Sequence, residues 1–298
     1  MAGSTVSRRA FGKFLAELRS NAGKAPLASA LSIEVSKMTL HRLENGVPTR
    51  ITTPSLERLL EFYEVSSETR AEALTLWREV QEQAKAARLQ GNSGSWKEYA
   101  DQFDSHFPHY LRLEGDTHHL TTHQLVLIPG LLQTPDYKRA IVRIDEPDLS
   151  AVNLERRVEL VERRQTRLHD AGFRMDAFIS EAALRHQPAD GPVMFDQMQW
   201  LASIGQRENV SIRVVPFSAK AHRGLTIQSF TLLEFPQLSR GLVEPPVVYF
   251  EGAYGAGYHE RDDVIDGYRH AISALEAVAL TEEDTLDMVL RTAKEYAT

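Results

Sequence analysis

The sequence contains no cysteine among its 298 residues. This excludes disulfides, thiolate metal sites, iron–sulfur clusters and a cysteine nucleophile, and it is typical of a protein from a reducing compartment. No apolar run approaches the ~18 residues that a membrane span needs. The opening residues, MAGSTVSRRAFGKF, contain no apolar core of signal-peptide length. We therefore expect a cytoplasmic protein with no membrane partner.

Motifs that carry well-understood chemistry are also missing. The sequence has no G-x-S-x-G, no Walker A lysine and no H-E-x-x-H. His118, His119 and His123 lie close together, but a zinc site needs three or four convergent ligands. We interpret these three as polar surface histidines. We expect no enzymatic activity, no cofactor and no bound metal.

Charge is distributed unevenly along the chain. Overall, 34 lysines and arginines face 41 aspartates and glutamates, a net charge of −7. Residues 1–50 have eight basic and three acidic side chains, a net charge of +5. The remaining residues have 26 basic and 38 acidic side chains, a net charge of −12. A basic end on an acidic protein is typical of a local surface that binds a polyanion.

The N-terminal part is predicted to be all helical. Apolar residues recur at helical spacing in residues 7–22 and 55–65, and shorter helices are predicted from about Ala25 and after Ser36. Residues 67–89 form one long amphipathic helix, and QGNSGS at 90–95 is a flexible break. We expect three parts: a DNA-binding domain at 1–66, a connecting helix and linker at 67–94, and a second domain at 95–298.

The second part alternates strand and helix patterns, which predicts a mixed α/β domain larger than the first. The fold class is therefore α+β, with an all-α N-terminal helix-turn-helix domain. The predicted strands are His119–Ile128, Phe173–Ile179, Val210–Val215, Ile227–Phe235, Val247–Glu251 and Gly257–His259. The predicted helices are 134–144, 150–170, 181–187, 193–207, 261–279 and 281–296.

Two short helices in succession, the second with a polar outer face, indicate a helix-turn-helix. Leu40 and Leu43 point inward at i, i+3, which leaves Lys37, Met38, Thr39, His41 and Arg42 on the outside. A helix fits the major groove of B-DNA, where its N-terminal residues reach base edges. We expect these five outer residues to read bases.

The segment GKAPLASALSIEVSKMTLHRLENG resembles the motif of the lambda/434-repressor-like XRE family, most closely in HRLENG. The resemblance implies base reading by Lys37, Met38 and Arg42. Arg19 and Glu44 resemble the family's structural ion pair between helix 1 and the recognition helix. The predicted phosphate contacts are Ser36, Asn45, Arg50 and Thr52.

Residues from about Ser95 to Lys294 resemble the C-terminal domain of unknown function that is common in actinobacterial XRE-type regulators. The segments LIPGLLQTPDYKRAI (127–141) and NVSIRVVPFSAKAHRG (209–224) carry this resemblance. It implies a small partner protein. A pocket for a small-molecule effector is a further hypothesis, because several polar residues lie near predicted strand ends and loops. The candidates are Tyr137, Arg185, His222, Glu251 and Tyr258.

The sequence therefore predicts a transcriptional regulator that binds double-stranded DNA as a homodimer, with half-sites about one helical turn apart. The long helix at 67–89 is a candidate dimer interface, through Leu74, Trp77 and Val80. The alternative is an antitoxin-like interaction protein whose main role is to bind a small partner protein. Pro26, which falls in the helix-turn-helix, and the acidic bulk of the chain favour this alternative slightly.

Overall fold

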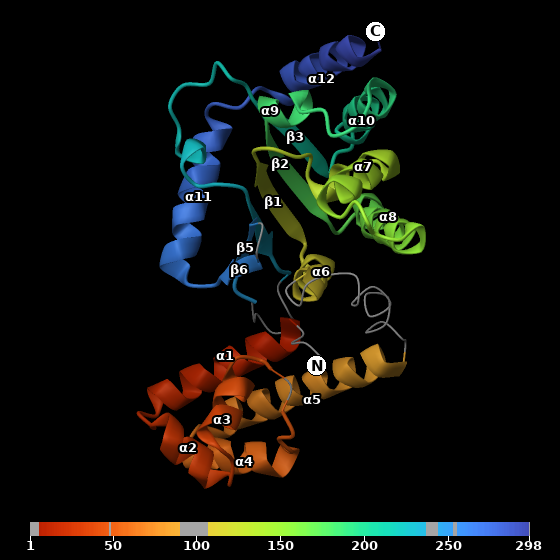
Figure 1. Cartoon of the computed structure of the whole chain (residues 1–298). Coiled ribbons are helices and arrows are strands. Elements are labelled where there is room, and N and C mark those ends of the chain that lie inside the picture. The colour runs from red at the N-terminus through yellow and green to blue at the C-terminus, as the bar shows by residue number, and fades with distance from the viewer. Residues whose placement is uncertain (1–5, 48, 90–106, 237–243, 253–254, 298) are drawn as a thin grey trace. The chain divides into compact units, whose positions relative to one another are not determined.

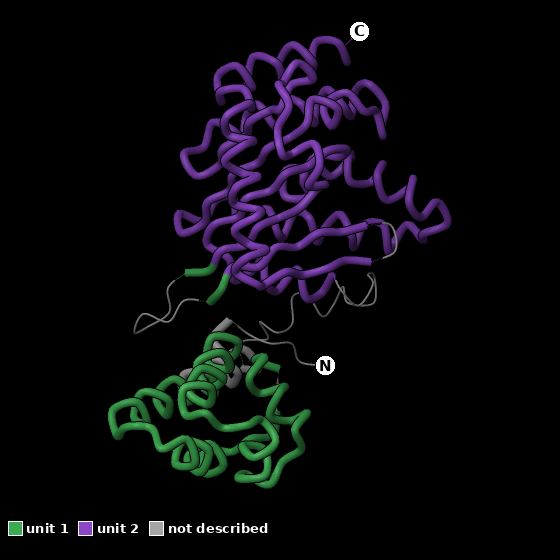
Figure 2. The backbone as a smooth tube through the Cα atoms, turned by 90° about the vertical axis from the view of Figure 1, so that its left-hand side faces the viewer, with its two compact units in different colours: residues 1–95, 235–245 green, residues 96–234, 246–298 purple. Residues whose placement is uncertain are grey.

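The chain divides into two compact units (Figure 2). The computed structural model describes residues 6–47, 49–89, 107–236, 244–252 and 255–297. One unit, here called the helical unit, consists of residues 1–95 together with 235–245. The other, the sheet unit, consists of residues 96–234 together with 246–298. The segment 235–245 therefore belongs to the same unit as the N-terminal helices, although it comes late in the sequence.

The described part of the helical unit contains five helices (Figure 1). They are α1 (Val6–Asn21), α2 (Pro26–Ser32), α3 (Lys37–Glu44), α4 (Thr53–Phe62) and α5 (Ser67–Leu89). Pro26 occupies the first turn of α2, where its missing N–H costs no hydrogen bond. The Ser36 hydroxyl begins α3 by accepting a hydrogen bond from the Thr39 amide at 3.1 Å. These boundaries lie close to the predicted ones, except that α4 spans Thr53–Phe62 where residues 55–65 were predicted.

One apolar core joins these helices. Its deeply buried side chains include Phe11, Leu15, Ala30, Leu40, Leu43, Leu56, Leu59 and Leu60. Trp77 of α5 packs against Phe11, with 5.2 Å between the ring centroids. Trp77 and Val80 are buried in this core, and Leu74 is partly buried against it. The expectation that Trp77 and Val80 supply dimer contacts is therefore wrong, because both already pack inside the unit.

The described part of the sheet unit contains one six-stranded mixed sheet in the order β3-β2-β1-β4-β5-β6. The strands are β1 (His119–Gln124), β2 (Arg174–Ser180), β3 (Val210–Val215), β4 (Phe230–Glu234), β5 (Val247–Gly252) and β6 (Gly255–His259). β1, β2 and β3 run parallel, whereas β4, β5 and β6 extend the sheet from β1 in antiparallel pairs. The prediction of an α+β chain with a mixed second domain is confirmed.

Helices cover both faces of this sheet (Figure 1). The helices are α6 (Phe107–Asp116), α7 (Pro135–Asp145), α8 (Ala151–Gln165), α9 (Glu181–Arg185), α10 (Gly191–Ile204), α11 (Asp262–Glu276) and α12 (Glu282–Tyr296). Short 3-10 turns are η2 (Gly130–Leu132), η3 (Thr166–His169) and η4 (Arg223–Leu225). On one face, Ile265 of α11 packs with Phe230 and Val248. α7, α8 and α10 lie on the other face (Figure 1).

Most predicted elements of the second domain are present, and several of their bounds differ by a few residues. β1 ends at Gln124 instead of Ile128, because the next amides leave the sheet: that of Leu125 donates to the Ser229 hydroxyl and that of Ile128 to the Tyr137 hydroxyl. The helix α6 was not predicted. It begins next to Pro108, which the first turn of a helix tolerates.

Candidate nucleic-acid interface

The second helix of the helix-turn-helix, α3, has one buried face and one exposed face. Leu40 and Leu43 are 1% and 2% exposed. The exposed residues are Lys37, Met38, His41 and Arg42, and Thr39 is half-buried. Met38, His41 and Arg42 follow Lys37 by one, four and five residues. The four exposed side chains therefore lie along one side of the helix. α3 therefore presents two long cations, a histidine and a methionine to solvent as one continuous row.

An ion pair ties α3 to α1. Arg19 Nε lies 2.6 Å from Glu44 Oε1, and Arg19 Nη2 donates to Glu44 Oε2 at 3.1 Å. The two side chains are only 18% and 10% exposed. The hydrogen bond to Glu44 raises the pKa of Arg19, so the pair remains charged. Because the pair is bidentate, it fixes both the position and the orientation of the last turn of α3 relative to α1.

Two glycines allow the backbones of α1 and α3 to touch. A Cβ atom on Gly12 would lie 2.5 Å from the carbonyl oxygen of Glu44. A Cβ on Gly46 would lie 2.5 Å from the Cα of Arg9, and Gly46 has a φ of 65°. No side chain fits at these distances, and the positive φ favours glycine. The start of α1 and the end of α3 are therefore fixed against each other.

The predicted phosphate contacts lie at both ends of α3 and before α4. Ser36 and Thr52 are exposed N-caps, and the Thr52 hydroxyl accepts from the Ser55 amide at 3.4 Å. The Asn45 side-chain amide donates to the His41 carbonyl at 2.8 Å and so completes the end of α3. Arg50 is exposed. All four side chains are accessible on the same stretch of chain as the exposed row.

The predicted pocket residues of the sheet unit are mostly engaged in local contacts. Tyr137 is fully buried, and Arg185 pairs with Glu181 and Glu295. His222 precedes η4.

Two of the five candidates, Glu251 and Tyr258, lie on the neighbouring strands β5 and β6. Burial and the charge of Glu251 raise the pKa of Tyr258.

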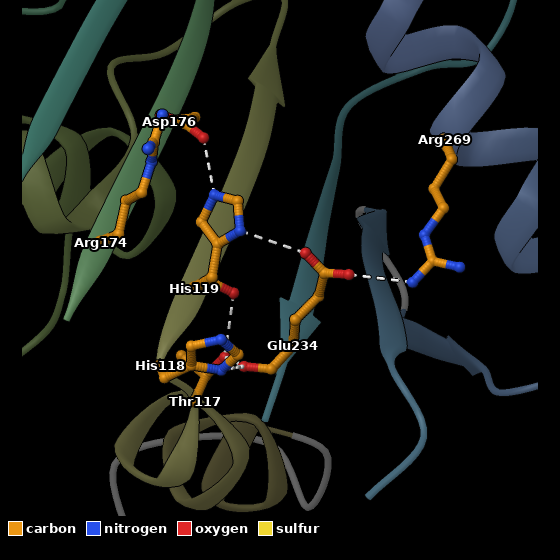
Figure 3. Close-up of polar contacts among 7 residues, drawn as sticks. All are labelled: Thr117, His118, His119, Arg174, Asp176, Glu234 and Arg269. Carbon is orange, nitrogen blue, oxygen red and sulfur yellow. Dashed lines mark hydrogen bonds and ion pairs between the residues drawn. The ribbon is translucent and has the colours of Figure 1, made fainter. Parts of the chain in front are cut away.

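A charged network that the sequence did not indicate crosses the sheet at His119 (Figure 3). The ring donates from Nε2 to Asp176 at 2.6 Å and from Nδ1 to Glu234 at 3.2 Å. Arg174 lies 3.1 Å from Asp176, and Arg269 lies 2.9 Å from Glu234. Five charges of alternating sign thus connect β2, β1, β4 and α11.

Hydrogen bonds to Asp176 and Glu234 raise the pKa of His119 to about 9. The same bond to His119 lowers the pKa of Glu234 to about 2. His119 is therefore an imidazolium at neutral pH, and the two carboxylates occupy opposite ring nitrogens. No group of three or more metal-ligating side chains occurs within the described residues.

The interpretation of all three histidines as surface residues is wrong for His123, which is 1% exposed. Its ring lies between the carbonyl oxygens of Phe178 and Gly224, each at 3.3 Å. Burial lowers its pKa, so the ring is neutral and packs as part of the core.

Comparison with known families defines the class and then the family of the chain. A family described as a helix-turn-helix domain matches residues 10–73, which include the whole of α2 and α3. The chain thus contains a helix-turn-helix domain, and a domain of this kind suggests DNA binding. A domain of unknown function, DUF5753, matches residues 107–291. This match covers more than half of the chain, and the protein belongs to the DUF5753 family.

No curated protein and no solved structure matches the chain. None of the described helices is long and apolar enough to cross a membrane.

Proposed function

We propose that this protein is a sequence-specific transcriptional regulator that inserts α3 into the major groove of DNA. The observation that carries the proposal is the exposed row on α3, held over the buried Leu40 and Leu43. Lys37 and Arg42 match the acceptors of guanine, and Met38, which is 66% exposed, matches a thymine methyl group. Thr39 and His41 complete the set of base-reading residues.

Phosphate contacts would fix the register of α3 on the duplex. Ser36, Asn45, Arg50 and Thr52 carry hydroxyl, amide or guanidinium groups suited to phosphate oxygens. They flank α3 in a segment with a net charge of +5 over residues 1–50. This local charge offsets the acidic remainder of the chain and attracts the backbone of DNA.

The sheet unit would sense a ligand or dock a small partner protein, and the protein would bind DNA as a homodimer in the cytoplasm. The sheet unit supports this role because it is a separate compact unit. Glu251 and Tyr258 are the candidate ligand contacts that lie together. We assign no catalytic role to any residue.

The test is selection of bound sequences from a random duplex DNA pool with the full-length protein. Wild type is compared with Lys37→Ala, Arg42→Ala and Arg291→Ala, the last removing an exposed arginine of α12 in the sheet unit. We expect a palindromic consensus, and Arg42→Ala to lose about 1–3 kcal/mol of discrimination at one position. Arg291→Ala should select the wild-type consensus.

If no sequence is enriched and the α3 variants behave like wild type, α3 does not read bases. Co-purification of a stoichiometric small protein, without salt-sensitive DNA binding, would then favour the antitoxin-like alternative.

A further inference from the structure

A small pocket lies within the sheet unit where α10, β3 and α12 meet (Figure 1). Its volume is about 200 Å³. An apolar cavity of about 150 Å³ is large enough to hold a benzene molecule, so this pocket has room for one small organic group. None of the five effector candidates named from the sequence lines it. We call it the α12 pocket, and its lining includes Leu201, Ala202, Ile212, Glu282, Glu283 and Val289.

The inner wall of the α12 pocket is apolar. Leu201 of α10, Ile212 of β3 and Val289 of α12 are all buried. The Thr285 hydroxyl also lines the pocket, but its oxygen already accepts a hydrogen bond from the Val214 amide at 3.0 Å. Water gains few hydrogen bonds at such a wall, whereas burial there stabilises an apolar group. The wall therefore favours the apolar part of a ligand.

Gly205, at the end of α10, also lines the pocket. Its φ of −69° and ψ of −6° are right-handed helical angles, which residues other than glycine adopt as well. A Cβ atom at this position would lie 3.4 Å from Ile212 Cδ1 and 3.1 Å from the Leu201 carbonyl oxygen. A side chain would take up space beside these two lining residues. Because the backbone does not require glycine here, the missing side chain contributes to the size of the pocket.

The two charged residues of the lining are both carboxylates. Glu282 and Glu283 are exposed and lie in the first turn of α12. The Glu282 carboxylate accepts a hydrogen bond from the Ser211 hydroxyl, which holds it beside β3. Glu283 has no hydrogen-bond or ion-pair partner among the described residues. The helix dipole alone would place about half a positive charge at this end of α12. Asp284 is a third carboxylate of the same turn, so the entrance of the pocket is negative.

The arginines that adjoin the lining residues in the sequence are bound elsewhere. Arg207 donates from Nε to the Leu168 carbonyl at 3.0 Å. Arg213 donates from Nε to the Leu280 carbonyl at 2.8 Å. Neither arginine forms an ion pair with the carboxylates at the entrance. The entrance therefore attracts a cation and repels an anion.

We propose that the α12 pocket binds a small organic ammonium ion. Its apolar body would lie against Leu201, Ile212 and Val289, and its charged nitrogen would lie at Glu282 and Glu283. Apolar walls with a few placed polar groups are the usual form of a small-molecule site. The binding itself does not require DNA. The role of such an ion as an effector of transcription rests on the proposed function.

The test is an NMR titration of the full-length, methyl-labelled protein without DNA. Three probes share one aromatic ring and differ in charge: benzylammonium, benzyl alcohol and benzoate. The methyl groups of Leu201, Ile212 and Val289 report binding at the pocket and distinguish it from binding elsewhere on this acidic chain. We expect benzylammonium to shift these signals with a dissociation constant of about 1 mM or tighter. It should bind at least about fivefold more tightly than benzyl alcohol, and benzoate should leave the signals unchanged.

Two variants separate the charge of the pocket from its volume. Glu282→Gln/Glu283→Gln should weaken benzylammonium binding at least about fivefold and leave benzyl alcohol within about twofold of wild type. Ala202→Leu, which adds apolar atoms to the wall, should weaken the binding of both probes about tenfold or more. If Ala202→Leu does not fold, the glutamine variant still decides, because it changes only exposed side chains.

The matched control is Asp262→Asn/Asp287→Asn. It removes the same amount of charge from two exposed carboxylates that do not line the pocket. If the attraction is local to the pocket, this variant binds benzylammonium as wild type does. An equal loss in the control and in Glu282→Gln/Glu283→Gln would overturn the proposal, because the net charge of the chain would then explain the binding.

Three further outcomes would overturn the proposal: no shift of the three methyl signals by benzylammonium, equal affinities of wild type for benzylammonium and benzyl alcohol, or an unchanged affinity in Glu282→Gln/Glu283→Gln. Failure of wild type to bind DNA would defeat the proposed function and leave the ammonium site standing. A wild type that binds DNA but not benzylammonium would defeat this inference alone.

Discussion

Replacing His119 by glutamine removes the central cation of the charged network and leaves the carboxylates of Asp176 and Glu234 facing one another. The magnitude follows from the pKa of His119, which rises from 6.5 to about 9 on folding. At about 1.4 kcal/mol per unit of pKa, the charged ring contributes on the order of 3 kcal/mol. The three side chains are between 18% and 27% exposed, so solvent screens this interaction only in part.

The sign of the pH dependence follows from the raised pKa. The folded state holds the proton more tightly, so the contribution is fully present below pH 6.5 and is lost as the pH rises through about 9. Lys138 acts in the opposite direction, because burial and the charge of Arg164 lower its pKa to about 8. Its contribution to stability increases as the pH rises above 8. The informative quantity is therefore the difference between wild type and His119→Gln, since Lys138 is common to both.

The assay is urea unfolding of wild type and His119→Gln from about pH 6 to about pH 10. We expect wild type to be more stable by about 3 kcal/mol near neutral pH, and the difference to shrink toward zero above pH 9. A difference that stays constant up to pH 10 would contradict an electrostatic origin of the stabilisation, because it would show that packing rather than charge is responsible. No difference at neutral pH would refute it equally.

Other substitutions test the helical unit by urea unfolding. Arg19→Met should lower the free energy of unfolding of this unit by about 2–4 kcal/mol, because Glu44 is left half-buried without its cation. A decrease of less than about 0.5 kcal/mol would contradict this prediction. Glu34→Gly should raise the free energy of unfolding by about 0.5–1 kcal/mol, because Glu34 has a φ of 57°, which glycine adopts more easily. A decrease in stability would show that the backbone at Glu34 is not strained. Gly46→Ala should lower the free energy of unfolding by more than about 2 kcal/mol and weaken DNA binding, because the added methyl group would clash with the Arg9 backbone. A variant as stable as wild type would contradict the close contact between Gly46 and Arg9.

Local patterns were sufficient to predict the helix-turn-helix. Ser36, Gly46 and the spacing of Leu40 and Leu43 define α3 through interactions within a few residues, and such interactions are readable in one sequence. The strands were predicted for the same reason, from runs of β-branched and aromatic residues. β1 was predicted too long because its end depends on tertiary contacts, which the amides of Leu125 and Ile128 make with the hydroxyls of Ser229 and Tyr137.

Contacts between distant parts of the sequence could not be predicted. His119 gains its partners from β2 and β4, and a histidine on a half-buried strand has the same local pattern whether or not carboxylates flank it. The burial of Glu244 could not be predicted either, because a glutamate before two prolines is typical of an exposed loop. Its burial against Arg9 is visible only in the folded chain.

Base reading by the exposed row on α3 can be measured through the dissociation constant for DNA. Wild type, Arg42→Ala and Arg291→Ala would each be measured on the selected duplex and on a duplex with one altered half-site, over a range of salt concentrations. We predict that Arg42→Ala narrows the affinity ratio between the two duplexes by about 5- to 150-fold, equivalent to about 1–3 kcal/mol, while Arg291→Ala keeps the wild-type ratio. An unchanged ratio in Arg42→Ala, with wild type itself discriminating, would contradict base reading by α3.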